Sequence, residues 1–238
     1  MLVEIYSDVV CPWCYVGKRR FEKALAEFDG RDDVRVVWRP FQLDPRAPAQ
    51  PTPSLDGYAR KFGGPAAAIE ITGRMTQMAE AEGLDFDFGI AQRANTLDAH
   101  RLIWLGGQLG VQDAVKERLL RAYFTEGVDV ADHDELTRLG TEAGLPAERV
   151  RAMLGSDEGF AEVRAEIEEG LERGVSAVPT FVFEGTWAVP GAQDPTTMLA
   201  VLRRVQEKLG QATADASVSP AAATDGDADA CADDACDV

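Results

Sequence analysis

Two cysteines near the start of the chain, Cys11 and Cys14, are the residues best suited to chemistry. They enclose Pro12 and Trp13 and follow an apolar, β-prone opening, residues 1–6. Apolar residues at helical spacing come next, so we expect the pair where a strand ends and a helix begins. The unpaired N–H groups of a helix start favour an anion. A thiolate is such an anion, and its pKa can fall there from about 8.5 to about 3.5–7.5.

The spacing of the two cysteines favours a redox pair. Residues three apart on a helix lie on one side of it, close enough for a disulfide. We predict that Cys11 is the exposed, attacking sulfur and that Cys14 is the buried, resolving one. A Cys-x-x-Cys pair is also found as half of a zinc site or as two unrelated core cysteines, so its surroundings must decide between these.

The composition predicts a globular protein and excludes polyanionic partners. Of the 238 residues, 45% are hydrophobic, and the formal net charge is −17. So acidic a surface argues against nucleic acid or an anionic membrane as a partner, because both would repel it. No apolar run is long enough to span a bilayer.

The opening residues also bear on the compartment. Glu4 and Asp8 interrupt the apolar stretch, so we expect no signal peptide and a cytoplasmic protein. In a reducing cytosol a permanent structural disulfide is not expected, whereas a transient catalytic one is. We therefore expect the Cys11 and Cys14 pair to cycle between dithiol and disulfide.

Strand and helix patterns follow one another along the chain. Residues 34–39 predict a second strand, and residues 45–53, which hold four prolines, an irregular connector. Residues 55–155 have helical periodicity throughout, with a capping box at Asp132 and Glu135. The order so far is a strand, a helix, a strand and a helical block.

The last third of the chain predicts a helix, a hairpin and a helix. An amphipathic helix ends at Gly174. Two apolar runs within residues 178–189 meet at a Glu-Gly dipeptide, which is typical of a β-hairpin. Residues 194–195, Asp-Pro, begin a last helix, expected to end near 209.

Residues 211–238 differ from the rest in composition. They hold seven aspartates and no Lys, Arg or aromatic residue, which predicts a disordered tail. The tail carries Cys231 and Cys236, and a tether of its length has a root-mean-square reach of about 25 Å. We predict that these two cysteines form an auxiliary redox pair that exchanges with the first pair. The alternative is that they are incidental.

The chain has two histidines, His100 and His133. His133 lies in an acidic stretch that resembles a solvated helix start, so capping rather than catalysis explains it. His100 lies among apolar residues on a helix of the block. We interpret it as a satisfied core or rim histidine, with a contact near the active-site cleft as the alternative.

Several motifs together resemble a known family. The chain is similar to the DsbA-like thioredoxin-fold oxidoreductases, and more narrowly to their cytoplasmic FrnE branch, over about residues 2–209. The likeness rests on the Cys-Pro-Trp-Cys motif after a strand, the helical insertion, a Cys-x4-Cys pair near the end, and the motifs Phe41-Gln42-Leu43-Asp44-Pro45, Asn95-Thr96, Ala99-His100, Val178-Pro179-Thr180 and Gly191-Ala192-Gln193.

The resemblance assigns roles to residues of the site. It implies that Cys11 is the nucleophile, that Cys14 is the resolving thiol, and that the bond before Pro179 is cis. It also implies that the backbone of Val178 pairs with an extended substrate beside Cys11. We expect Pro12 and Trp13 to contact substrate too.

One departure from the family concerns the dipeptide between the cysteines. The strongly oxidising periplasmic members have Pro-His there, and this chain has Pro12 and Trp13. A histidine can add positive charge near the thiolate, and Trp13 cannot. Cys11 is therefore expected to be less acidic than in those relatives, which makes reductase or isomerase activity as plausible as oxidase activity.

These inferences predict an α/β protein with a thioredoxin-like fold, a large α-helical insertion and a flexible acidic tail. We divide it into a first thioredoxin-like part (1–54), the insertion (55–155), a second thioredoxin-like part (156–210) and the tail (211–238). The predicted function is thiol–disulfide exchange on protein or small thiol and disulfide substrates, with no cofactor and no metal.

Two other functions stay open at this stage. The first is a glutathione-dependent isomerase or transferase of the 2-hydroxychromene-2-carboxylate isomerase or kappa type. Those proteins usually carry serine where this chain has Cys11, which counts against them. The second is a zinc-binding redox sensor in which Cys11, Cys14, Cys231 and Cys236 hold one metal ion. That site would require the tail to fold back on the body.

Overall fold

The apolar opening of the chain forms the central strand of a four-stranded sheet. The computed structural model describes residues 1–48 and 50–217. Within these residues the elements are β1 (Leu2–Ser7), α1 (Pro12–Ala26), η1 (Arg31–Asp33), β2 (Arg35–Pro40), β3 (Thr52–Pro53), α2 (Ser54–Phe62), α3 (Pro65–Glu80), β4 (Gln92–Arg93), α4 (Leu97–Gln108), α5 (Gln112–Thr125), α6 (His133–Glu142), α7 (Ala147–Leu154), α8 (Phe160–Glu172), β5 (Thr180–Phe183), β6 (Trp187–Pro190) and α9 (Pro195–Ser217).

The sheet has the strand order β2-β1-β5-β6 and is mixed. β1 runs parallel to β2, with Ile5 opposite Trp38, and antiparallel to β5, with Ile5 opposite Phe181. Ile5 and Phe181 are fully buried. A strand that is buried on both faces reads as a continuous apolar run, and this is why the opening residues of the chain lack polar alternation.

The predicted hairpin is confirmed. β5 and β6 pair antiparallel, with Phe183 opposite Trp187. The turn between them contains Glu184 at φ 51° and Gly185 at φ 64°. The Thr186 N–H donates a hydrogen bond of 3.0 Å to the carbonyl of Phe183, so these two residues form the middle of a tight turn within a three-residue loop, and glycine adopts a positive φ without steric cost.

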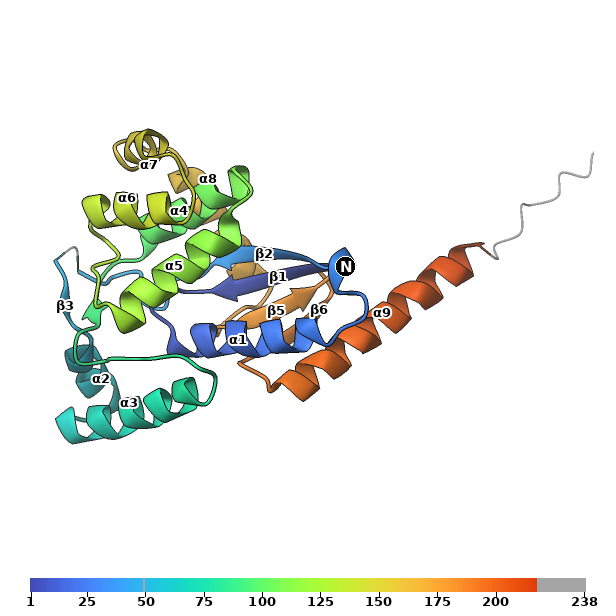
Figure 1. The fold of residues 1–238 in the computed structure, drawn as a ribbon, viewed down its shortest axis with the longest axis horizontal. Helices are drawn as coiled ribbons and strands as arrows, with labels where there is room; N and C mark the ends of the chain where they lie inside the picture. The colour runs from blue at the N-terminus through green and yellow to red at the C-terminus, as the bar shows by residue number, and fades with distance from the viewer. Residues whose placement is uncertain (49, 218–238) are drawn as a thin grey trace, which may run out of the picture.

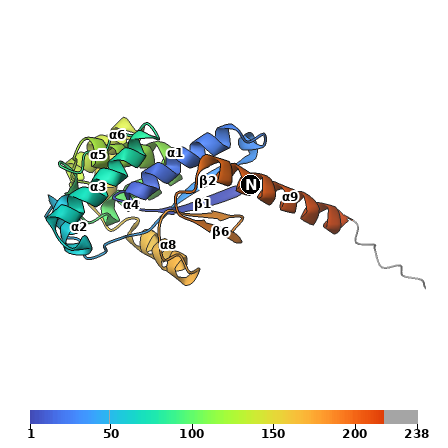
Figure 2. The same ribbon diagram turned by 90° about the horizontal axis from the view of Figure 1, so that it is seen from below.

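Helices cover both faces of the sheet. α1 and α9 pack against each other on one face, and α8 lies on the opposite face (Figures 1 and 2). In the helical block, α4 to α7 stand beyond the edge formed by β2, where α4 and α5 contact that strand, whereas α2 and α3 lie on the side of α1, which α3 contacts. One continuous apolar core joins sheet and block, since Ile5, Phe21, Leu102, Phe124 and Met198 belong to the same buried cluster. Figure 1 therefore shows an α/β fold of the thioredoxin type with a helical insertion, as predicted.

Charged side chains dock α1 onto the helical block. The Lys18 ammonium, which is 2% exposed, forms ion pairs with Asp113 at 3.2 Å and Glu117 at 3.1 Å on α5, and with Glu22. Tyr15 donates a hydrogen bond of 2.7 Å to Glu117. Because α1 begins at the cysteine motif, these contacts fix the orientation of that helix relative to the insertion.

The periodicity of residues 55–155 predicts an insertion that is helical throughout, and this prediction is wrong at one place. Within it, Gln92 and Arg93 form β4, which pairs antiparallel with β3. Two-residue strands leave no detectable period in a sequence, so only the folded chain reveals them. The capping residue at the start of α6 is confirmed, since the side chain of Asp132 accepts a hydrogen bond of 2.8 Å from the Glu135 N–H.

The last helix is longer than its sequence predicts. Asp194 caps it by accepting a hydrogen bond of 2.9 Å from the Thr197 N–H. It runs to Ser217, seven residues into the segment 211–238 that we expected to be a disordered tail. Three of the seven residues 211–217 are alanine, a strong helix former, and propagation of an existing helix is favourable even where a helix would not begin.

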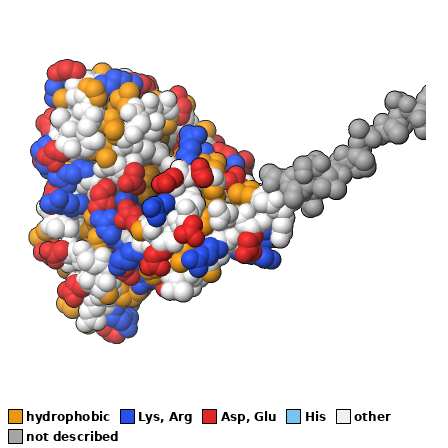
Figure 3. Space-filling model, turned by 45° about the vertical axis from the view of Figure 1, so that its right-hand side comes forward, with side chains coloured by type: hydrophobic (Ala, Val, Ile, Leu, Met, Phe, Trp, Pro, Cys, Tyr) orange, Lys and Arg blue, Asp and Glu red, His pale blue; other side chains and the backbone are white. Residues whose placement is uncertain are grey.

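The surface of the described part mixes both signs of charge. On the face shown in Figure 3, acidic and basic side chains lie interspersed. Among the described residues, no helix is both long enough and apolar enough to cross a membrane.

Candidate active site at the start of α1

Cys11 occupies the N-cap position of α1, at the end of the sheet where β1 ends. Pro12 is the first residue of the helix, a position at which a missing N–H costs nothing. The Cys14 N–H donates a hydrogen bond of 3.1 Å to the carbonyl of Cys11, closing the first turn. The predicted junction of strand and helix is therefore confirmed.

Both sulfurs are buried. Cys11 is 3% exposed and Cys14 1% exposed, and both are free thiols. We expected Cys11 to be exposed. The loop before β5 encloses it instead, a contact between residues that are far apart in the sequence.

That loop brings Val178 to Cys11. The bond between Val178 and Pro179 is cis, as the resemblance implies. The Cys11 thiol donates a hydrogen bond of 3.6 Å to the carbonyl of Val178. Val178 and Trp13 are half-buried, whereas Pro12 and Pro179 are buried. Of the predicted substrate-binding residues, Val178 thus lies directly against the predicted nucleophile, and Trp13 is partly exposed.

Gly17 lets α1 approach the loop this closely. A Cβ atom at Gly17 would lie 2.9 Å from Cγ of Pro179 and 3.4 Å from Cβ of Ala192. Arg20, one turn further along α1, donates a hydrogen bond of 2.8 Å to the carbonyl of Ala192. The motif Gly191-Ala192-Gln193, noted in the sequence, therefore packs on the cysteine helix behind Pro179.

A buried carboxylate, that of Asp8, lies three residues before Cys11. One of its oxygens accepts a hydrogen bond of 2.8 Å from the Val9 N–H, and the other one of 2.8 Å from the Leu43 N–H. His100 Nε2 lies 3.2 Å from the first oxygen and 3.1 Å from the carbonyl of Phe41. Burial opposes ionisation of Asp8, but the hydrogen bond and the charge of His100 outweigh it and lower the pKa of this carboxyl.

This contact explains His100. The side chain is 2% exposed and hydrogen-bonded, as expected of a satisfied core histidine, and its partner precedes the cysteine motif. Both interpretations that we considered for His100 therefore apply. His133 is the first residue of α6 and lies 2.9 Å from Asp98 at the surface, away from the cysteines, which agrees with the capping interpretation.

Each thiol affects the pKa of the other, so the pair ionises as a unit. The hydrogen bond with Cys14 and burial raise the pKa of the Cys11 thiol. Burial opposes ionisation of Cys14 too, but the hydrogen bond from Cys11 and the positive charge of Lys116 outweigh it, and the pKa of the Cys14 thiol is lowered. The first negative charge therefore resides on Cys14, whereas the helix start led us to expect it on Cys11.

Two of the residues that stabilise this charge escaped the sequence analysis. Lys116, on α5, is 1% exposed, and its ammonium lies 5.5 Å from the centre of the Trp38 ring. Ser7, at the end of β1, is 1% exposed, and its hydroxyl, which has no other partner among the described residues, lowers the pKa of the Cys14 thiol. Lys116 carries no motif signal, because it is a lysine within an ordinary amphipathic helix.

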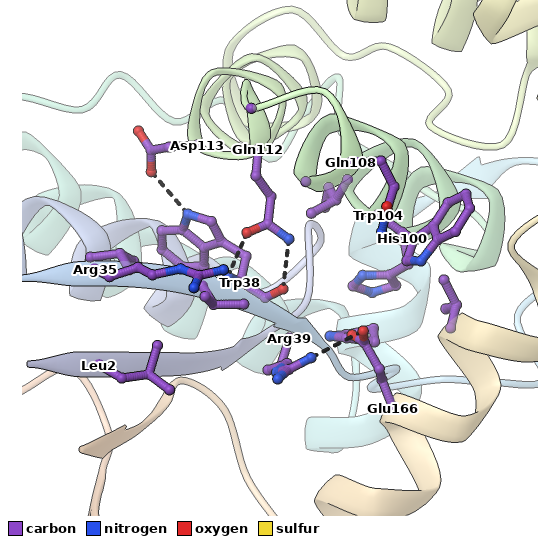
Figure 4. Close-up of a pocket in the computed structure, with 17 residues that line it drawn as sticks. Leu2, Arg35, Trp38, Arg39, His100, Trp104, Gln108, Gln112, Asp113 and Glu166 are labelled. Carbon is purple, nitrogen blue, oxygen red and sulfur yellow. Dashed lines mark hydrogen bonds and ion pairs between the residues drawn. The ribbon is translucent and has the colours of Figure 1, made fainter. Parts of the chain in front are cut away.

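A large cavity follows the outer edge of β2 (Figure 4). It measures about 600 Å³ and lies between β2, α4, α5 and α8. The side-chain amide of Gln112 bonds the backbone N–H and carbonyl of Trp38 at 3.0 and 3.1 Å, as a neighbouring strand would. His100 lines its inner wall, but neither cysteine does. This cavity is therefore separate from the predicted redox site.

The auxiliary pair of the sequence analysis, Cys231 and Cys236, lies outside the described residues. The proposed exchange with the first pair and the four-cysteine zinc site both depend on it and stay untested predictions. Within residues 1–48 and 50–217, no group of three or more His, Cys, Asp or Glu side chains is placed to hold a metal ion.

Comparisons with known proteins agree with this geometry. The family model described as DSBA-like thioredoxin domain matches residues 2–203. The uncharacterized protein YwbO of Bacillus subtilis (strain 168) is 30% identical over 192 residues, which cover 80% of this chain and 90% of YwbO. The crystal structure of the probable DsbA oxidoreductase SCO1869 from Streptomyces coelicolor is 36% identical, with a TM-score of 0.83 over 100% of this chain and 99% of that one. The cytosolic disulfide reductase DsbM from Pseudomonas aeruginosa, solved with GSH, shares the fold at 21% identity and a TM-score of 0.57, over 87% of this chain and 100% of DsbM.

Proposed function

Because the chain belongs to the family of DSBA-like thioredoxin domains, we propose that it is a thiol–disulfide oxidoreductase whose redox pair is Cys11 and Cys14. One observation carries the proposal. Cys11 caps α1 at the end of β1, and its sulfur lies 3.6 Å from the carbonyl of Val178, the residue before Pro179. A nucleophile at a helix start thus faces a backbone segment that can hold an extended substrate.

The reaction follows from the pair of sulfurs. The Cys11 thiolate attacks one sulfur of a substrate disulfide, so that a mixed disulfide forms and the other substrate sulfur leaves as a thiolate. Cys14 then attacks the sulfur of Cys11, and the second substrate sulfur leaves. The substrate gains two electrons and two protons, and the protein dithiol becomes a disulfide. The same steps in reverse oxidise a substrate dithiol.

The burial of Cys14 suits the second step. Lys116 and the Ser7 hydroxyl favour a negative charge on this sulfur, so Cys14 can be an anion when the mixed disulfide forms beside it. The ionisation of the two sulfurs is linked, so the charge can pass to Cys11 for the first step. In this scheme the negative charge lies on Cys14 before the substrate binds and moves to Cys11 when Cys11 attacks.

Substrate contacts belong to the same proposal. The carbonyl of Val178 accepts a hydrogen bond from Cys11 in the free protein and can accept one from the backbone of a substrate when the mixed disulfide forms. Trp13, two residues after Cys11, offers a half-buried aromatic surface. Protein and small thiol or disulfide substrates both fit this description. We further propose that the protein acts as an isomerase or reductase, that it belongs to the FrnE branch, and that it is cytoplasmic.

The test uses variants of the pair in a chain that lacks the tail thiols, Cys231→Ser with Cys236→Ser, so that only Cys11 and Cys14 react. Cys11→Ser should abolish the reduction of a disulfide substrate, and Cys14→Ser should trap the mixed disulfide at Cys11, visible by mass spectrometry. If Cys14→Ser lost disulfide reduction as fully as Cys11→Ser and no mixed disulfide were trapped at Cys11, the roles assigned to the two cysteines would be contradicted. A zinc content of one ion per full-length chain would favour the metal-binding alternative instead.

A further inference from the structure

A second cavity lies beside the cysteine motif, and we propose that it binds a carboxylate of the substrate, so that the protein prefers small disulfides that carry carboxylates. The proposal rests on the function proposed above and names its substrate class. It depends on two tyrosine hydroxyls, on the charges around the cavity and on the burial of Cys11.

The cavity lies between the loop that precedes Cys11 and the helical insertion. It measures about 480 Å³. Its walls come from the loop between β1 and Cys11, from the segment after β2, from α2, and from β4 and α5, and include Asp8, Val10, Leu43, Asp44, Ser54, Tyr58, Arg60, Lys61, Arg93, Thr96 and Tyr123. Val10 is the residue directly before Cys11. The volume falls within the range of cavities that hold small molecules.

Two tyrosines give the cavity its hydrogen-bond donors. Tyr58 on α2 is half-buried, and Tyr123 on α5 is 4% exposed. Neither hydroxyl has a hydrogen-bond partner among the described residues. Burial raises the pKa of both phenols, and the neighbouring Cys11 raises that of Tyr58 further, so both remain protonated donors. Both residues line the cavity, so a ligand bound there can supply the acceptor.

The charges around the cavity favour an anion. Arg93 is neutralised by an ion pair with Asp44, through a hydrogen bond of 2.9 Å from its Nε. Arg60 and Lys61, on α2, form no ion pair with a described residue. The remaining carboxylate, Asp8, is buried and hydrogen-bonded to two backbone N–H groups and to His100. In a chain of net charge −17, two unpaired cations at one cavity form a local positive site.

The burial of Cys11 argues for a small substrate. Its side chain is only 3% exposed, so a folded protein cannot bring a disulfide to it without displacing the surrounding loops. Cys11 does not line the cavity, but Val10, its neighbour in the chain, does, so a small disulfide with its carboxylate against Tyr58 and Tyr123 needs a smaller displacement to reach Cys11.

The experiment compares three small disulfides that differ in charge. Fully reduced full-length protein is mixed with an excess of dithiodipropionate, hydroxyethyl disulfide or cystamine, which are anionic, neutral and cationic. Oxidation of the peptide that contains Cys11 and Cys14 is followed by acid quench and mass spectrometry. We expect the anionic disulfide to react at least about tenfold faster than the neutral one at subsaturating concentration, the effect of hydrogen bonds to a charged group. The cationic one should react most slowly.

Variants of the cavity residues test whether they cause the preference for the anionic disulfide. Tyr58→Phe with Tyr123→Phe should remove most of the advantage of dithiodipropionate through a higher half-saturation concentration, and leave the rate with hydroxyethyl disulfide within about twofold. Arg60→Gln with Lys61→Gln should lower the anionic rate at low salt and abolish its salt dependence. Tyr6→Phe is the matched control, since Tyr6 packs with Phe41, Val175 and Val182 in a separate buried cluster. It should change none of these rates.

A binding measurement keeps the test independent of catalysis. Suberate is a carbon analogue of dithiodipropionate without the disulfide, and hexanediol is the neutral counterpart. By titration calorimetry, the full-length wild type and Tyr6→Phe should bind suberate and not hexanediol, and the double phenylalanine variant should bind neither.

The outcomes separate the two proposals. If none of the three disulfides oxidises Cys11 and Cys14, the proposed function fails. If all three do so at equal rates and suberate does not bind, exchange is real and the carboxylate site is refuted. If the double variant does not fold, Tyr58→Phe alone and suberate binding to the wild type decide the question.

Discussion

Replacing Gly17 by alanine tests how closely α1 packs against the Pro179 loop. Gly17 is buried in the middle of α1, and the added methyl group would lie 2.9 Å from Cγ of Pro179 and 3.4 Å from Cβ of Ala192. Carbon atoms pack best at about 3.5–4.0 Å, so the loop must retreat by roughly half an ångström or more.

The magnitude follows from two opposing effects. Overpacking of this kind costs about 1–3 kcal/mol. The helix gains about 1 kcal/mol, because alanine has a higher helix propensity than glycine. Gly17→Ala should therefore lower the free energy of unfolding by up to about 2 kcal/mol. Gly73→Ala in α3 is the matched control, since its methyl group meets no atom within 4 Å, and it should raise that free energy by about 1 kcal/mol.

The assay is urea unfolding of both variants and the wild type with reduced cysteines, followed by the rate of disulfide exchange. The two variants should differ by about 1–3 kcal/mol, and Gly17→Ala should also slow exchange because Val178 moves relative to Cys11. Equal stabilisation by both alanines, with an unchanged exchange rate, would refute the close packing of α1 on this loop.

Three further predictions concern the charges of the site and the tail. Lys116→Met should raise the pKa of the Cys14 thiol, because it removes a nearby positive charge, and the pH dependence of alkylation of the pair should then move to higher pH; an unmoved profile would exclude Lys116 as a counter-ion. Asp8→Asn should cost about 1–3 kcal/mol at pH 7, since an amide cannot accept from both backbone N–H groups. The pKa of Asp8 is lowered below its usual 3.8, so this carboxyl stabilises the fold above that pH and loses the contribution as pH falls further. The difference in urea midpoint between Asp8→Asn and the wild type should thus narrow below about pH 4, and a constant difference would contradict the ionised state. For the tail, mild oxidation of Cys14→Ser with Cys236→Ser should give a Cys11–Cys231 bridge, detected by mass spectrometry, and absence of this bridge with unchanged turnover after removal of residues 211–238 would exclude the relay.

The structure changes the expected geometry of that relay. α9 leads the chain away from the end of the sheet where β1 ends and α1 begins (Figure 1). At 1.5 Å per residue, a helix of 23 residues is about 35 Å long. The segment that would carry Cys231 back to Cys11 therefore starts at residue 217, farther from Cys11 than it would if the helix ended at residue 210. We expect the Cys11–Cys231 bridge to form between two copies of the protein, and hence faster at higher protein concentration.

The sequence by itself determined the elements and the motif. Strands, helices and the hairpin follow from local patterns: an apolar run in β1 interrupted by Glu4, a Glu-Gly turn at 184–185, and caps at Asp132 and Asp194. Each of these depends on hydrogen bonds and turn conformations within a few residues, which neighbouring residue types decide. The cysteine pair at a helix start belongs to this group.

Only the tertiary structure decided what surrounds the sulfurs. Asp8 meets His100 across 92 residues, and Cys11 meets Val178 across 167. Lys116 and Tyr123 come from α5, and Tyr58 from α2, with no motif to mark them. Such contacts arise from the packing of the insertion and of the β5 loop on α1, which depends on how whole buried surfaces fit together. For that reason the sequence predicted the nucleophile, whereas the fold determined its burial, its counter-charge and the cavity beside it.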